Sequence, residues 1–86
     1  MGDLGEYSAH MSTEAVAALL GMSKRNRVAV LDIADRIAET PSQISDYRTA
    51  DADGRSMENL MVDGFLFTYW VDHASREVRI TEVIRL

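Results

Sequence analysis

The stretch Met57–Leu86 decides the fold: it reads MENLMV, then Asp63-Gly64, then FLFTYWV, and, after a second turn at Asp72–Arg76, EVRITEVIRL. Asp-Gly between two apolar, aromatic-rich runs is the strongest short-range hairpin signal, because both turn positions must accept a positive φ. The last run alternates enough to form a further strand. The stretch therefore predicts three antiparallel strands in sequence.

Two helices are predicted ahead of this hairpin. Ser12 precedes TEAVAALL and is expected to cap a first helix that ends near Gly21. Ser23 is expected to cap a second helix that runs to about Glu39. Thr40-Pro41 ends this second helix, because the residue before a proline is disfavoured in the α region.

The expected buried face of the second helix is broad. One stripe contains Val28, Leu31, Ala34 or Asp35, and Ala38, and it is widened by Val30, Ile33, Ala34 and Ile37.

In the strand 65–71, alternate residues face opposite sides of the sheet, so Tyr69 and Trp70 point apart and at least one belongs to the core. Phe65, Phe67, Tyr69 and Val71 share one face. In the last strand the same rule groups Val78, Ile80, Ile84 and Leu86, with Glu82 among them.

The remaining segments complete the fold class. Glu6–Met11 is predicted as a short first strand, with Tyr7 its best strand former. Ile44–Ala50 is either an edge strand or part of a polar surface connection. The prediction is a single α+β domain over residues 1–86: a short N-terminal strand, an αα-hairpin and an antiparallel β-meander.

Composition limits the classes of function. The chain has 86 residues, 47% of them hydrophobic, a formal net charge of −5 and no cysteine, which excludes disulfides, thiolate metal sites and a cysteine nucleophile. No apolar stretch approaches the roughly 20 residues that span a bilayer. The N-terminus lacks the layout of a signal peptide, so we expect a cytoplasmic protein without a membrane partner. Because the core is small, a partner or a homodimer is expected.

The only basic cluster is Lys24-Arg25-Asn26-Arg27, at the start of the second helix. Cations are disfavoured there by about 0.3–1 kcal/mol each, because the helix dipole is positive at that end. A solvated face is the favoured interpretation, and a site for a phosphate or an acidic partner is the alternative. With a net charge of −5, nucleic acid would have to bind through such a local patch.

Other candidate sites are weaker. Asp51-Ala-Asp53-Gly54 resembles part of a calcium loop, but the first and twelfth ligand positions would fall on Thr49 and Leu60, so a polar turn is predicted. His10 and His73 have no helical partner for a metal and are expected at the surface. Glu82 would suit acid–base work if buried, and a bulge or a strand end that exposes it is the commoner outcome. We expect no metal and no cofactor.

The order of elements and several motifs resemble the RelE/ParE superfamily, the toxins of bacterial type II toxin–antitoxin modules. Ser12–Ala15 resembles the family's entry into the first helix, and Leu20–Arg25 resembles its helix-turn-helix, in which the second helix starts with basic residues. Ile33–Pro41 resembles the family's end of the second helix. Met61–Asp72 resembles its "Val-Gly-x-Tyr-Arg-x-x-Tyr-x-Val-Asp" hairpin.

The resemblance implies a toxin that acts on translation, through ribosome and mRNA, or on gyrase, with a cognate antitoxin and a role in plasmid stabilisation. In the family's ribosome-dependent nucleases, an arginine commonly follows the first hairpin aromatic; here that residue is Leu66. The family's C-terminal His/Arg-Tyr pair has no counterpart, and Arg85 is the one basic residue near that place and the one candidate catalytic residue. The binding candidates are Lys24, Arg25, Arg27 and Tyr69. The alternatives are a RelE-fold interaction domain without catalysis and an unrelated small α+β binding domain.

Overall fold

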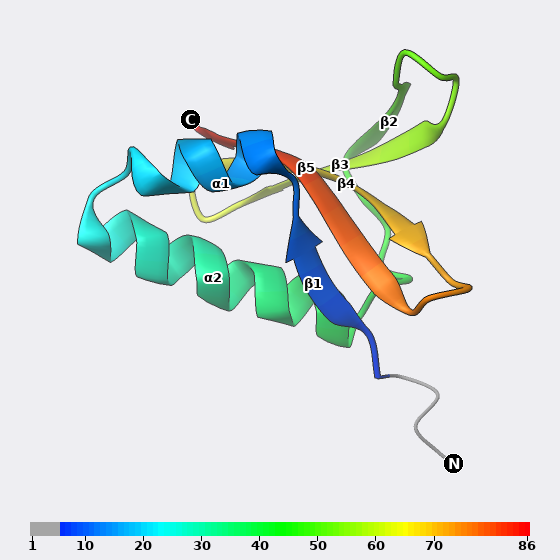
Figure 1. Ribbon diagram of the computed structural model, residues 1–86, viewed down its shortest axis with the longest axis horizontal. Helices are drawn as coiled ribbons and strands as arrows, with labels where there is room; N and C mark the ends of the chain where they lie inside the picture. Colours follow the sequence, from blue (N-terminus) through cyan, green and yellow to red (C-terminus); the bar gives the residue numbers. More distant parts are fainter. Residues whose placement is uncertain (1–5) are drawn as a thin grey trace.

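The computed structural model describes residues 6–86, which form a five-stranded sheet with both helices on one side (Figure 1). The strand order is β1-β5-β4-β3-β2. The predicted α+β class is confirmed. The elements are β1 (Ser8–Met11), α1 (Thr13–Leu20), α2 (Lys24–Glu39), β2 (Tyr47–Ala50), β3 (Ser56–Val62), β4 (Phe65–Asp72) and β5 (Glu77–Arg85).

Strands β3, β4 and β5 are antiparallel neighbours, as predicted, whereas β1 pairs in parallel with β5. The register places Met11 opposite Ile80. The two helices form the connection out of β1, and the chain returns to the sheet at the opposite edge. The first strand begins at Ser8, two residues later than the predicted Glu6.

The hairpin and the helix caps follow the predicted chemistry. Asp63 and Gly64 both have positive φ, 52° and 85°, as the two-residue turn requires. The hydroxyl of Ser12 accepts a hydrogen bond from the Ala15 amide at 3.1 Å, and that of Ser23 accepts one from Asn26 at 3.2 Å. Each serine therefore satisfies an amide that the first helical turn leaves without a partner.

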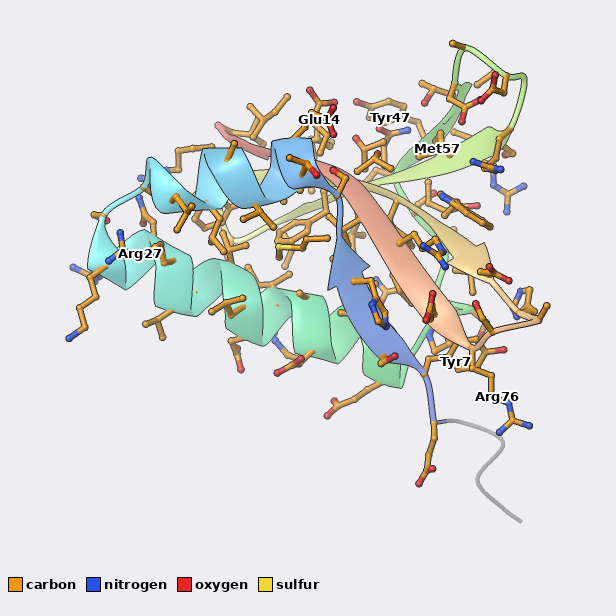
Figure 2. All side chains as sticks on the ribbon, viewed as in Figure 1. Tyr7, Glu14, Arg27, Tyr47, Met57 and Arg76 are labelled. Atoms are coloured by element: carbon orange, nitrogen blue, oxygen red, sulfur yellow. The ribbon has the colours of Figure 1, made fainter. Side chains whose placement is uncertain are left out.

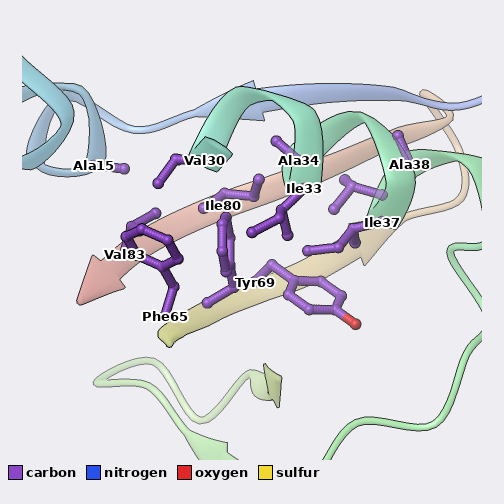
Figure 3. Close-up of a cluster of buried hydrophobic side chains, with 12 residues drawn as sticks. Ala15, Val30, Ile33, Ala34, Ile37, Ala38, Phe65, Tyr69, Ile80 and Val83 are labelled. Atoms are coloured by element: carbon purple, nitrogen blue, oxygen red, sulfur yellow. The ribbon is translucent and has the colours of Figure 1, made fainter. Parts of the chain in front are cut away.

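The core lies between α2 and the sheet (Figure 3). Phe67 and Tyr69 are fully buried in it, as is Ile80. On α2, the buried side chains are Val30, Ile33, Ala34, Ile37 and Ala38. The predicted stripe is wrong at two positions, because Val28 and Leu31 lie on the side of α2 that faces solvent, with exposed fractions of 60% and 49%.

A bulge in β5 changes the predicted faces of the last strand. Thr68 pairs with Glu82 and Tyr69 with Ile80, so Thr81 is the extra residue. The alternation therefore reverses: Val83 is buried with Val78 and Ile80, whereas Glu82, Ile84 and Leu86 are exposed. The bulge confirms the expectation that Glu82 is exposed.

Of the two alternatives predicted for Ile44–Ala50, the structure shows the edge strand. β2 occupies Tyr47–Ala50 and pairs with β3 only. The Asp51 carboxylate accepts hydrogen bonds from the amides of Asp53 and Arg55, and Gly54 has a φ of 79°. The predicted polar turn is thus confirmed, since this carboxylate stabilises the turn itself.

Candidate functional site

The face of the sheet that the helices leave uncovered carries a row of apolar side chains. Leu66 alternates with the buried Phe65 and Phe67, so it points away from the helices. Its neighbours across the sheet are Met61 on β3 and Ile84 on β5. Met61 and Ile84 are 50% and 40% exposed. We call Met61, Leu66 and Ile84 the apolar row.

Further along the same face, Trp70 is flanked by two arginines. The guanidinium carbon of Arg55 lies 4.0 Å from the centre of the Trp70 ring, and that of Arg79 lies 5.8 Å from it. Arg79 is the register partner of Trp70 on β5. Both cations therefore contact the electron-rich face of the indole, a favourable arrangement for a cation and an aromatic ring.

Two surface hollows meet at Trp70 and Arg55, which line both. One has a volume of about 480 Å³ and the other about 300 Å³. The larger hollow is completed by Pro41, Ser42, Gln43, Arg48, Ser56, Glu58, Val71 and His73, and the smaller one by His10, Met11, Ser12, Arg79, Ile80 and Thr81.

The arginines of these hollows are already paired with carboxylates. Arg55 lies 3.7 Å from Asp51, and Arg48 lies 3.2 Å from Glu58.

Arg79 contacts both Asp72, at 3.6 Å, and Glu77. Hydrogen bonds from the side chain and backbone of Ser75 hold the pKa of Asp72 below its ordinary value, and Arg79 adds to this effect. The carboxylates of the region thus balance its guanidinium groups, and no strong attraction for a polyanion remains.

The two histidines lie at the rims of the hollows, at the surface as predicted. His73 shares a hydrogen bond of 2.7 Å with the hydroxyl of Tyr7, and the two rings meet edge to face. His10 lies 3.3 Å from Glu77 and 3.0 Å from the Ser8 hydroxyl. No group of three or more metal-ligating side chains occurs within residues 6–86.

The described residues around His10 are not arranged as a catalytic triad, because the Ser8 hydroxyl and the Glu77 carboxylate both contact the same ring nitrogen, Nε2, whereas a triad places its hydroxyl and its carboxylate on opposite nitrogens. Ser12, which lines the same hollow, uses its hydroxyl to donate to the Thr81 carbonyl at 3.0 Å and to accept from the Ala15 amide. Because the Ser12 hydroxyl donates its proton to a backbone carbonyl, it does not donate to the imidazole of His10 and is not activated by it.

The predicted basic cluster lies where the sequence placed it, at the start of α2 beside the turn from α1. Arg27 donates to the Met22 carbonyl at 2.7 Å, and so closes this turn (Figure 2). Lys24 and Arg25 are exposed, and within residues 6–86 neither has a hydrogen bond, an ion pair or a ring contact.

Arg85, the predicted catalytic candidate, lies at the end of β5 with its guanidinium carbon 5.5 Å from the centre of the Phe65 ring. No interaction within the described residues links it to the cluster on α2. The four cations named from the sequence therefore do not form one site in this structure.

Tyr69, predicted as a binding residue, is fully buried and offers no surface to a partner. Its ring packs beneath α2 near Ile37 (Figure 3). Within residues 6–86, its hydroxyl has no hydrogen-bond partner. Burial raises the pKa of this hydroxyl above 10.0, and the carboxylates of Glu58 and Asp46 raise it further. Its position on the core face of β4 explains the difference from the prediction.

The side chains around Trp70 were not identified from the sequence as a site. Arg48, Arg55 and Arg79 are isolated in the chain, and they meet only through the pairing of β2, β3, β4 and β5. One signal was available: Arg79 alternates with core residues of the last strand, so it shares the face opposite to them. For Ile84 the same alternation assigned the wrong face, because the bulge at Thr81 reverses the alternation in the rest of β5.

Neither a family model nor a curated protein matches this sequence. Solved structures do match the fold. The RelBE2 toxin–antitoxin complex from Mycobacterium tuberculosis matches with a TM-score of 0.77 and 17% identity, over 94% of this chain and 99% of that one. The RelE–RelB complex from Pyrococcus horikoshii matches with a TM-score of 0.70 and 13% identity, over 93% and 94%. The isolated E. coli RelE toxin matches with a TM-score of 0.71 and 14% identity, over 92% and 83%. The chain therefore has the fold of the RelE toxins.

Proposed function

We propose that this chain is the toxin of a bacterial toxin–antitoxin pair, and that it arrests growth by binding a protein such as gyrase in the cytoplasm, without cutting RNA. Three of the similar structures are RelBE or RelE–RelB complexes, from Mycobacterium tuberculosis, Pyrococcus horikoshii and E. coli. This supports an antitoxin as a partner of the present chain. Within residues 6–86, no helix is long and apolar enough to cross a membrane.

The observation that carries the proposal is the apolar row on the uncovered face of the sheet. Cleavage of RNA requires donors aimed at the charge that develops on the phosphate. If the resemblance of Met61–Asp72 to the family's hairpin holds, Leu66 takes the place of the arginine common in the ribosome-dependent nucleases. Its register partners Met61 and Ile84 also provide no donor. A row of exposed apolar side chains is instead suited to a protein surface.

The charge balance around Trp70 supports the same conclusion. Arg55 and Arg79, the two arginines that contact Trp70, are each paired with at least one carboxylate, so this part of the uncovered face lacks the excess of cations that holds a phosphate backbone. A second candidate function, a RelE-fold interaction domain without toxicity, is favoured by the same paired charges. The two candidates differ in whether the free chain stops growth.

Induced expression in bacteria tests the proposal. We expect growth arrest with induction of the DNA-damage response and with intact mRNA. Arrest with mRNA cut at ribosomes would overturn the gyrase-like mechanism, and normal growth at verified expression would favour the interaction domain.

A matched pair of variants locates the surface that acts on the target. Leu66→Glu places a charge in the apolar row and is expected to abolish arrest, whereas Leu20→Glu, on α1, is expected to leave it unchanged. Circular dichroism melts of both purified variants control for unfolding. Equal loss of arrest in two folded variants would contradict a target site on the sheet.

A further inference from the structure

The larger of the two hollows beside Trp70 is separate from the apolar row, and the proposed function does not use it. Its wall comes from the segment after α2, from β2 and β3 with the turn between them, and from the end of β4 with the turn after it. Met61, Leu66 and Ile84 are not among the described residues that line it. Its volume of about 480 Å³ lies within the usual range of small-molecule pockets, about 300–1,000 Å³.

Several side chains of this hollow are still able to donate a hydrogen bond. Within residues 6–86, the hydroxyls of Ser42 and Ser56 and the indole N–H of Trp70 have no hydrogen-bond partner. The Gln43 side chain accepts a hydrogen bond from the Thr40 hydroxyl at 2.8 Å through its oxygen, and within the same residues its NH2 group donates to no partner. These groups favour a ligand that carries hydrogen-bond acceptors.

The wall itself offers few acceptors in return. Among the described residues that line the hollow, Glu58 alone has a carboxylate, and one of its oxygens already has two partners. This oxygen, Oε1, accepts from the Ser45 hydroxyl at 2.7 Å and from Nε of Arg48 at 3.2 Å. The hollow therefore presents more donors than acceptors, and a ligand with an acceptor group of its own complements it.

Arg55 is the residue best suited to bind such an acceptor. Its guanidinium lies over the ring of Trp70, and its Nη1 is 3.7 Å from Asp51, beyond the distance of a hydrogen bond. The Asp51 carboxylate instead accepts from the backbone amides of Asp53 and Arg55. The side chain of Arg55 therefore donates no hydrogen bond within residues 6–86, and a guanidinium binds a carboxylate through two parallel N–H···O bonds.

We propose that this hollow binds a small aromatic monocarboxylate. The carboxylate of the ligand pairs with Arg55. Its aromatic ring lies against Pro41, Val71 and Trp70, which form the apolar part of the wall. The uncommitted hydroxyls and amide of the wall complete the contacts with the carboxylate oxygens.

The balance of charge around the hollow selects a ligand with a single negative charge. Arg48 and Arg55 already lie beside Glu58 and Asp51, so little positive charge is in excess. A phosphate monoester has a charge of about −1.5 to −2 at pH 7 and is less well matched to this site. A monocarboxylate has one charge, and its planar group fits the fork of a guanidinium.

The test is a titration of benzoate into the full, isotopically labelled chain, followed by NMR. Benzamide, which has the same shape without the charge, is the matched ligand. We expect benzoate to shift the indole N–H of Trp70 and the backbone amides of Ser42, Gln43 and Ser56, with a dissociation constant in the millimolar range that a ligand of this size permits. Benzamide should bind about tenfold more weakly, because a charge-assisted hydrogen bond is stronger than a neutral one. Inorganic phosphate at the same concentration should not displace benzoate.

Variants identify the residue responsible. Arg55→Gln removes the charge and is expected to weaken benzoate binding about tenfold, to the level of benzamide, without changing the binding of benzamide. Arg55→Lys keeps the charge but not the two parallel donors, and its affinity for benzoate should fall between the two. Arg36→Gln is the control, because Arg36 pairs with Asp32 and Asp63 and does not line the hollow, so both ligands should bind as they do to the parent chain. Circular dichroism melts check the folding of each variant.

Four results would overturn the proposal: no saturable shift at millimolar benzoate, equal binding of benzoate and benzamide, shifts centred outside the wall of the hollow, or unchanged benzoate binding by Arg55→Gln. Equal loss of both ligands in Arg55→Gln would also contradict it, because the contact between charges is lost for benzoate alone. The measurement does not depend on toxicity. Binding without growth arrest would therefore contradict the proposed function alone, and growth arrest without binding would contradict this inference alone.

Discussion

The guanidinium of Arg55 lies over the ring of Trp70, 4.0 Å from its centre, and this contact joins the turn before β3 to the middle of the sheet. Arg55 is also held by Asp51, whose carboxylate organises the turn. The loop between β2 and β3 is therefore fastened to β4 by one side chain.

Arg55→Ala is expected to lower the free energy of unfolding by about 0.5–1 kcal/mol, the usual contribution of an exposed cation–aromatic contact. Since Trp70 is the only tryptophan, its fluorescence reports the change directly, and we expect a shift of the emission maximum to longer wavelength. Arg48→Ala is the control, because Arg48 pairs with Glu58 and does not contact the ring. An unchanged emission spectrum in Arg55→Ala would show that the arginine does not cover Trp70 in solution.

Ser12 and Ser23 provide a second comparison, because both cap a helix but only Ser12 also reaches the sheet. Its hydroxyl donates to the carbonyl of Thr81, the bulged residue of β5. Ser23→Ala should cost about 1 kcal/mol, for the lost cap. Ser12→Ala should cost about 2 kcal/mol, since a second hydrogen bond to the backbone is lost with the cap. Urea denaturation measures both, and equal losses would show that the link to Thr81 contributes nothing.

The core gives the clearest contrast between what the sequence predicts and what the structure shows. Leu31 belongs to the stripe of α2 that was predicted to be buried, but the structure exposes it, so substitutions at Leu31 test which stripe is buried. Phe67→Ala should cost about 3–5 kcal/mol, because a fully buried aromatic leaves a cavity. Leu31→Ala should cost less than about 1 kcal/mol, because the side chain lies on the solvent side of α2. Thermal or urea unfolding that gave similar losses would contradict this assignment of faces.

The order of elements, the Asp63-Gly64 turn and both serine caps followed from local chemistry, so they were predictable. Each depends on a few neighbouring residues and on backbone angles that only certain residue types adopt. Which faces of α2 and β5 are buried was harder to predict from the sequence. Both stripes of α2 contain apolar residues, and periodicity alone does not tell which stripe meets the sheet.

The candidate sites depended on tertiary pairing that local patterns do not contain. Trp70 and Arg79 are nine residues apart and meet because β4 and β5 pair, and Arg55 comes from a turn before another strand. The bulge at Thr81 arises where two strands of this sheet adjust to each other, and it moves Ile84 to the face of Leu66. Tyr69, conversely, follows the simple alternation of β4 and is therefore buried, so its ring is not at the surface of this structure.

The hydroxyl of Tyr69 gives the last prediction. Because this buried group has no hydrogen-bond partner among residues 6–86, Tyr69→Phe is expected to raise the free energy of unfolding at neutral pH, by about 1 kcal/mol, through removal of an unsatisfied polar atom. The substitution also changes the response to alkali. The pKa of Tyr69 is raised above 10.0 in the folded chain, so above pH 10 the unfolded chain loses this proton more readily, and stability falls as the pH rises toward the folded-state pKa. Tyr69→Phe should therefore lose less stability than the parent chain between pH 9 and pH 11, roughly the range in which a tyrosine titrates. Tyr47→Phe, at an exposed tyrosine, is the control for the substitution itself. Urea melts across this range make the comparison, and a Tyr69→Phe curve parallel to that of the parent would show that the hydroxyl is not held protonated by burial.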